Sequence, residues 1–169
     1  MRFYPMRRIV TPPDTSDTQA SSGQATHFRA LEHLYAEAPI NNLFRSSLAI
    51  TGAGRSRITF ETRPEFFHAA EATHGTLYFK MLDDAAFYAA NSLVSDRFLL
   101  TTGFNLHFTK PLRNGTVIAE GRWVSGKRRV FIAEANLIDA EGEEIGRGTG
   151  TFMRSHIALS GLAGYRMED

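Results

Sequence analysis

The fold of this chain is decided by one stretch of sequence, His74-Gly75-Thr76-Leu77-Tyr78-Phe79-Lys80-Met81-Leu82-Asp83-Asp84-Ala85-Ala86-Phe87-Tyr88-Ala89-Ala90-Asn91-Ser92. It contains no proline, and its Ala, Leu, Met and Lys residues favour a helix. A surface helix has a single apolar stripe, whereas apolar residues here point in all directions. The sequence therefore predicts a long central helix that is enclosed by protein.

Two carboxylates, Asp83 and Asp84, lie in the middle of this apolar helix. Removing a carboxylate from water costs several kcal/mol, roughly, so such a position indicates a function. The helical period rotates Asp84 about 100° away from Asp83, and the two groups therefore face different surroundings. Asp83 shares its face with Thr76, Lys80 and Phe87.

The composition sets limits on the class of protein. The 169 residues, 43% of them apolar, suffice for one globular domain, and a net charge of +1 gives no electrostatic reason to expect nucleic acid. The absence of cysteine excludes disulfides and cysteine nucleophiles. There is no apolar run of about 18 residues, and no apolar segment follows the basic N-terminal residues. We expect a cytoplasmic protein with no membrane partner.

The chain divides into three parts. Residues 1–25 are rich in proline and small polar residues and predict a flexible arm. Residues 26–157 predict the domain, which opens with an amphipathic helix from Thr26 to Pro39. Residues 158–169 form a short tail.

Alternating apolar residues predict a set of short strands around the central helix. A hairpin is expected over 48–50 and 55–63, before the helix. Four more strands joined by short turns are expected over 99–109, 116–124, 130–139 and 145–154. An α+β domain with one antiparallel sheet wrapped around the helix satisfies this order.

Several motifs resemble the hotdog fold and, within it, the acyl-CoA thioesterases of the phenylacetate-pathway (PaaI-like) type. The His74-Gly75 pair begins the helix, an acid follows nine residues after the histidine, and Asn91-Ser92 ends the helix. The later stretches 108–115 and 142–152 are also similar to that family. The resemblance implies a curved antiparallel sheet of about six strands around the helix, and hydrolysis of an acyl-CoA thioester without a cofactor.

The first turn of the helix and its acid have the chemistry for this reaction. A helix start offers free N–H groups and a partial positive charge, and Gly75 lets a carbonyl approach closely. We therefore expect an oxyanion hole at Gly75, helped by Thr76, although Gly75 could instead only start the helix against a tight neighbour. Asp83 is the expected general base or nucleophile. The alternative is a structural acid paired with Lys80.

The resemblance suggests roles for three more residues. His74 would orient the helix start through a ring hydrogen bond. His68 stands where many relatives carry asparagine and could polarise the carbonyl or water, or could be a solvated loop histidine. Thr101 matches a position where relatives place a hydroxyl that steadies the attacking water, or it is an ordinary strand residue.

The remaining candidates concern substrate binding and assembly. We expect the substrate to contact the Asp83 face of the helix, and basic turn residues to meet its phosphates unless they are only solvated; the set is Thr76, Lys80, Asp84, Phe87, Arg113, Lys127 and Arg128. The resemblance implies a homodimer or dimer of dimers with its active site at the subunit interface, which would also cover an unpaired sheet edge.

Three other functions stay open. The first is an enoyl-thioester hydratase or dehydratase, although the order of His74 before Asp83 argues against it. The second is a non-catalytic acyl-CoA-binding protein. A metal site formed by His68, His74 and Asp83 is a weaker idea, and we expect no metal.

Overall fold

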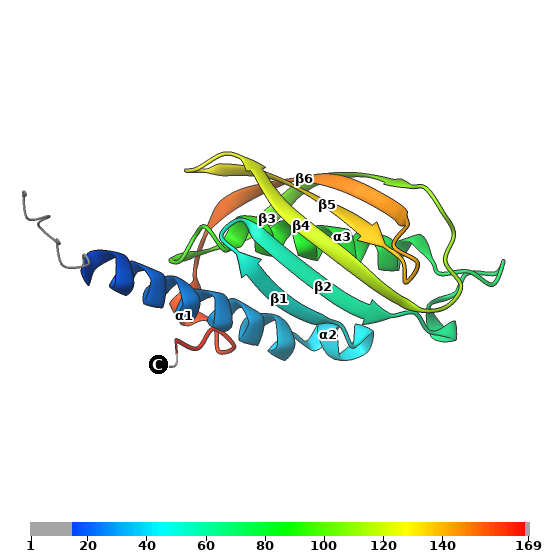
Figure 1. Ribbon diagram of the computed structural model, residues 1–169, viewed down its shortest axis with the longest axis horizontal. Coiled ribbons are helices and arrows are strands. Elements are labelled where there is room, and N and C mark those ends of the chain that lie inside the picture. The colour runs from blue at the N-terminus through cyan, green and yellow to red at the C-terminus, as the bar shows by residue number, and fades with distance from the viewer. Residues whose placement is uncertain (1–14, 168–169) are drawn as a thin grey trace, which may run out of the picture.

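The computed structural model describes residues 15–167, of which 15–21 are described only as helical backbone. Six strands and three α-helices follow one another as expected, with the long helix α3 between the second and third strands (Figure 1). The elements are α1 (Thr15–Glu37), α2 (Pro39–Phe44), β1 (Ser47–Gly52), β2 (Arg55–Glu61), η1 (Pro64–Phe66), α3 (Gly75–Asn91), β3 (Arg97–Phe108), β4 (Thr116–Ser125), β5 (Val130–Ile138), β6 (Glu144–Ala158) and η2 (Leu159–Gly161).

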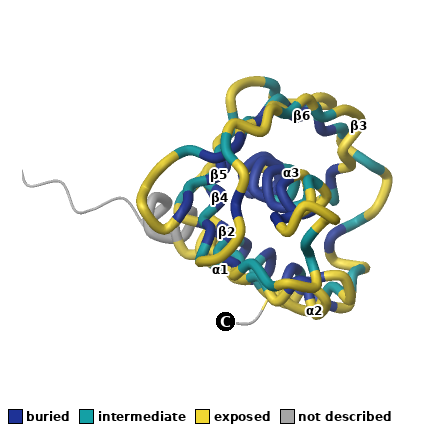
Figure 2. Tube along the Cα trace, turned by 90° about the vertical axis from the view of Figure 1, so that its right-hand side faces the viewer, coloured by how far each residue is buried: buried dark blue, intermediate teal, exposed yellow. Residues whose placement is uncertain are grey.

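The strands form one antiparallel sheet in the order β1-β2-β4-β5-β6-β3. The sheet curls around α3, which lies on its inner face (Figures 1 and 2). Eleven residues of α3 are buried, and Met81, Leu82, Ala85 and Ala86 are fully buried. The predicted α+β hotdog architecture, with an enclosed central helix, is confirmed.

Glycine at position 121 allows β4 to approach the middle of α3. A Cβ atom there would lie 2.1 Å from the carbonyl oxygen of Ala85, closer than any real contact. The Ser56 hydroxyl on β2 donates a hydrogen bond of 2.6 Å to the same carbonyl oxygen. This contact fixes the helix on the sheet at the level of the two acids.

The N-terminal helix begins earlier than the sequence predicts. Residues 15–25, expected in the arm, form its first turns, because extending a helix costs little once it has nucleated. The rest of the predicted arm lies outside the described residues. Pro39 ends α1 as expected, but it also starts α2, a helix that we did not predict, since proline suits the first turn.

Hydrogen bonds join α1, the end of α3 and the C-terminal tail. The buried His27 ring contacts the Tyr165 hydroxyl at 2.6 Å and the Asn91 carbonyl oxygen at 3.1 Å. Because a carbonyl can only accept, Nε2 donates to Asn91 and Nδ1 accepts from Tyr165. Burial lowers the pKa of His27, which favours this neutral form. Leu159 and Tyr165 are buried, so this part of the tail packs onto the domain.

The sheet ends on two edge strands, β1 and β3. β3 is twelve residues long, and its Leu100 and Phe108 side chains are 46% and 56% exposed. Among the described helices, none is long and apolar enough to cross a membrane.

Candidate active site

Asp83 lies in the middle of α3 and faces β3. The Thr101 hydroxyl donates a hydrogen bond of 3.0 Å to its Oδ1. Burial raises the pKa of Asp83 to about 6; the nearby Asp84 adds to this rise, while the Thr101 hydrogen bond and Lys80 oppose it. A carboxylate with this pKa is mostly ionised at neutral pH and can still accept a proton effectively.

Lys80 binds Asp84 rather than Asp83, which corrects one expectation. Its ammonium forms an ion pair with the Asp84 carboxylate and donates a hydrogen bond of 2.7 Å to Oδ1 of Asn41 on α2. The Tyr35 hydroxyl of α1 also lowers the pKa of Asp84, although burial raises this pKa overall. The two acids thus have different partners, and Asp83 remains free of a direct cation.

A cavity of about 270 Å³ opens beside these groups. α3 forms its floor, the ends of α1 and α2 form one wall, and the first residues of β3 form the other. Asp83, Asp84, Lys80 and Phe87 line it together with Thr101. Aromatic rings account for much of the remaining wall, from Tyr35, Tyr88 and Phe98.

The start of α3 carries a free backbone donor. Nδ1 of His74 accepts hydrogen bonds from the Thr76 N–H at 3.1 Å and from the Thr76 hydroxyl at 2.7 Å. The ring therefore caps the helix, and Thr76 is already bonded rather than free to help an oxyanion. Among the described residues, no acceptor bonds the Gly75 N–H. This donor points outward at the positive end of a 17-residue helix.

Gly75 also has a tight neighbour. A Cβ atom at this position would lie 2.9 Å from Cε2 of Phe108, the exposed last residue of β3. Both alternatives for Gly75 thus have a physical basis: it leaves the N–H open, and it makes room for the Phe108 ring.

His68 lies close to the helix start. The centre of its ring is 6.5 Å from that of His74, and its Nδ1 accepts a hydrogen bond of 3.1 Å from the Ala70 N–H. Both histidines are exposed. His68 therefore belongs to the same surface as Gly75, not to the cavity beside Asp83.

One chain does not bring the oxyanion donor and the acid together. Gly75 and Asp83 are eight residues apart on one straight helix, and thus about 12 Å apart along its axis. A thioester carbonyl cannot contact both groups at this separation.

The candidate phosphate-binding residues are also separated. Arg113 adjoins Leu112, whose carbonyl oxygen accepts from the Thr73 N–H beside the start of α3. Lys127 and Arg128 lie in the β4–β5 turn, beyond the opposite end of α3. Within one chain they do not form a common site.

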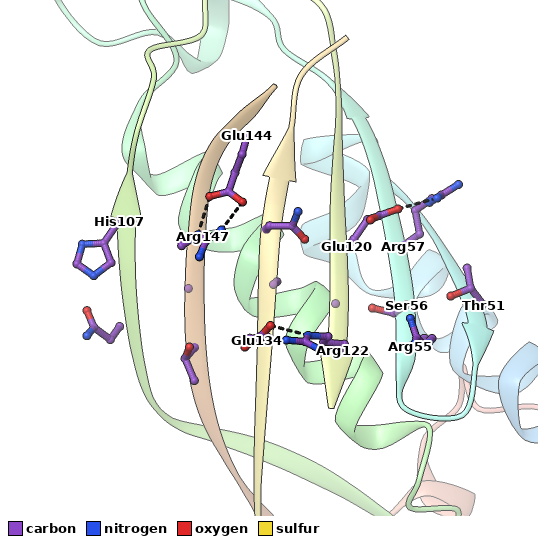
Figure 3. A pocket seen from close by; sticks show the side chains of 16 residues that line it. Thr51, Arg55, Ser56, Arg57, His107, Glu120, Arg122, Glu134, Glu144 and Arg147 are labelled. Carbon is purple, nitrogen blue, oxygen red and sulfur yellow. Dashed lines mark hydrogen bonds and ion pairs between the residues drawn. The ribbon is translucent and has the colours of Figure 1, made fainter. Parts of the chain in front are cut away.

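A larger hollow, of about 590 Å³, lies on the outer face of the sheet (Figure 3). Its three acids each bind an arginine: Glu120 binds Arg57, Glu134 binds Arg122, and Glu144 binds Arg147. These ion pairs leave no acid free to act as a base, so we place the candidate site at the smaller cavity.

Sequence reasoning missed the residues that α1 and α2 bring to the cavity. Tyr35 and Asn41 precede Lys80 by about forty residues, and no spacing rule connects them. Pro39 was the available signal, because a proline after a helix can also start another one. Among the described residues, no group of three potential metal ligands is close enough to hold a metal ion.

Comparisons with known proteins agree with this architecture. The thioesterase superfamily model matches residues 71–145, which include α3 and the strand that faces Asp83. A protein of Saccharolobus solfataricus whose name includes the word esterase is 24% identical over 100 residues, covering 59% of this chain and 67% of its own.

Solved structures show the same fold at low identity. The PaaI protein of the phenylacetic acid degradation operon of E. coli has a TM-score of 0.73 at 13% identity, covering 80% of this chain and 98% of its own. Thioesterase HI1161 of Haemophilus influenzae has a TM-score of 0.69 at 14% identity, covering 78% and 91%. The resemblance seen in the sequence is thus confirmed. The fold and the matched segment define the class as a hotdog-fold thioester hydrolase.

Proposed function

We propose that this protein hydrolyses an acyl-CoA thioester, with Asp83 as the general base and the Gly75 N–H as the oxyanion donor. The observation that carries the proposal is the Asp83–Thr101 pair in a cavity, beside an acid whose pKa is raised to about 6. Thr101 holds Oδ1, which leaves Oδ2 to accept a proton from water.

In the proposed reaction, water loses a proton to Asp83 and its oxygen attacks the thioester carbonyl. The oxyanion accepts a hydrogen bond from the Gly75 N–H. The carbon–sulfur bond then breaks, and the leaving thiolate takes the proton from Asp83. The products are a carboxylic acid and free CoA, and Asp83 returns to its ionised form.

Two copies of the chain build the site in this proposal. Because about 12 Å separates Gly75 from Asp83 along α3, the donor must come from a second copy. The exposed edge of β3, with its apolar Leu100 and Phe108, supports pairing between copies at this strand. Such pairing would let the helix start of one copy approach the acid of the other.

Release of free thiol from a panel of aryl, short-chain and long-chain acyl-CoAs tests the proposal. Asp83→Asn should lower the rate by a factor on the order of 10² or more, because it removes the base and keeps the shape. Glu120→Gln on the outer face, a matched loss of one carboxylate, should leave the rate unchanged. Equal rates for wild type and Asp83→Asn across the panel would reject hydrolysis through Asp83.

Attack by Asp83 itself is the alternative route, through an acyl-aspartyl anhydride. A single turnover in ¹⁸O-labelled water separates the two routes. General-base catalysis puts the label only into the released acid. Nucleophilic attack with hydrolysis at the aspartyl carbon puts it into Asp83, which mass spectrometry of the peptide detects.

A further inference from the structure

The hairpin between β4 and β5 projects beyond the C-terminal end of α3 (Figure 1). Its base is held firmly. The Trp123 N–H donates a hydrogen bond of 2.8 Å to the Gly54 carbonyl oxygen, and the Gly54 N–H donates one of 2.8 Å to the Ser92 hydroxyl at the end of α3. Inside the turn, the Trp123 indole N–H donates to the Gly126 carbonyl oxygen at 2.9 Å. The tip is thus presented in a fixed position.

This end of the sheet concentrates positive charge. Lys127, Arg128 and Arg129 at the tip are exposed and form no ion pair with the described residues. The Arg129 carbonyl oxygen accepts from the Arg154 N–H on β6, and Arg154 and Arg97 share a single acid, Asp96. Five cations thus face one carboxylate, although the net charge of the whole chain is only +1.

Apolar side chains lie between these cations on the outer face of the sheet. Val130 on β5 pairs with Met153 on β6, and Met153 pairs with Leu100 on β3. Their neighbours Phe131 and Phe152 are buried, so the three side chains point away from α3. Val130 and Leu100 are 41% and 46% exposed. An apolar centre with a charged rim is the usual anatomy of a protein–protein interface.

The same surface reaches the mouth of the cavity. Leu100 also lines the cavity beside Asp83, and the next residue, Thr101, donates the hydrogen bond to Asp83. A partner bound on this surface would therefore lie next to the reacting groups.

We propose that this basic surface, formed by Arg97, Leu100, Lys127, Arg128, Arg129, Val130, Met153 and Arg154, docks an acidic protein that carries the acyl group as a thioester. The inference rests on the proposed function, since it names a second source of the same thioester. Charge complementarity selects an acidic partner. The apolar centre selects a protein rather than the phosphates of free CoA, because phosphates have no apolar surface to bury there.

Binding is tested first, without hydrolysis. The probe is a purified acyl carrier protein whose phosphopantetheine arm carries no acyl group, titrated calorimetrically against the full chain. Arg128→Glu/Arg129→Glu should weaken binding at least tenfold, and added salt should weaken wild-type binding. Arg55→Glu/Arg57→Glu, the same charge change in the outer hollow, should bind like wild type. Equal binding by both variants, or no binding by wild type, would overturn the proposal.

Hydrolysis is tested second, with one acyl group on the carrier protein and on CoA. For Arg128→Glu/Arg129→Glu, the ratio of kcat/KM for the carrier thioester to kcat/KM for the CoA thioester should fall at least tenfold. An equal fall for both substrates would overturn the proposal, because the surface would then recognise phosphate. If wild type binds the carrier protein through this surface but hydrolyses neither thioester, the proposed function fails and the docking surface stands. Hydrolysis of CoA thioesters without carrier binding gives the reverse result.

Discussion

Asp83 is the residue whose protonation should set the pH dependence of the reaction. Its pKa is raised to about 6, first by burial, so the base is protonated and inactive below that pH. The rate should rise as pH increases through about 6 and become level above it. A rate that does not change between pH 5 and 8 would contradict a role for Asp83 as base.

Thr101→Val gives a signed test of the same pKa. The Thr101 hydrogen bond stabilises the ionised carboxylate and lowers the pKa of Asp83 against the effect of burial. Its loss should move the rising limb of the profile to higher pH. Profiles of kcat/KM for wild type and variant measure the shift, and Thr102→Val on the same strand is the control. A shift to lower pH would show that the hydroxyl does not bond the ionised acid.

At the scale of elements, the N-terminus of α3 combines an open donor with a close contact. Gly75→Ala places a methyl group against Phe108 and beside the N–H that is proposed to hold the oxyanion. We expect kcat to fall at least tenfold, since removing a single oxyanion donor costs about 10² to 10³ in known enzymes.

The double variant Gly75→Ala/Phe108→Ala separates these two effects. Removing the ring relieves the steric contact but leaves the methyl group beside the donor. If kcat stays low in the double variant while the melting temperature recovers relative to Phe108→Ala alone, the donor carries the effect. Full recovery of kcat would assign Gly75 a packing role.

The contact between α1, α3 and the tail depends on one phenol. Tyr165→Phe leaves Nδ1 of the buried His27 without its donor, which should lower the free energy of unfolding by about 1–2 kcal/mol. Thermal melts should show a fall of about 2–4 °C per kcal/mol for a chain of this size. Ser160→Ala, an exposed change in the same segment, is the control. An unchanged melt would mean that the hydrogen bond contributes nothing net.

At the scale of the whole molecule, the two-copy site predicts complementation. Asp83→Asn and Gly75→Ala should each be nearly inactive alone. A mixed dimer contains one site that joins the intact Asp83 of one copy to the intact Gly75 of the other. Random mixing should therefore restore about a quarter of the wild-type activity in a two-fold dimer. No recovery after exchange of subunits, verified by mass spectrometry, would place both groups of a site in one copy.

Local rules predicted most of the elements. The continuous apolar run from Leu77 to Ala90 could only be satisfied by a helix enclosed on all sides, and strict alternation marked the strands. The rules failed where competing structures differ little in energy. The polar segment before Thr26 continues α1 because propagation is cheap, and Pro39 both ends one helix and starts another.

The sequence by itself determined the hotdog architecture and identified Asp83, because a carboxylate within an apolar helix indicates a function wherever the helix packs. Only the tertiary structure decided which partner each acid takes. Lys80 is within reach of both acids along the helix, and contacts from α1 and α2 direct it to Asp84. Thr101 reaches Asp83 because the register of β3 on β6 turns it toward α3. Such pairings depend on elements distant in sequence, so no local pattern encodes them.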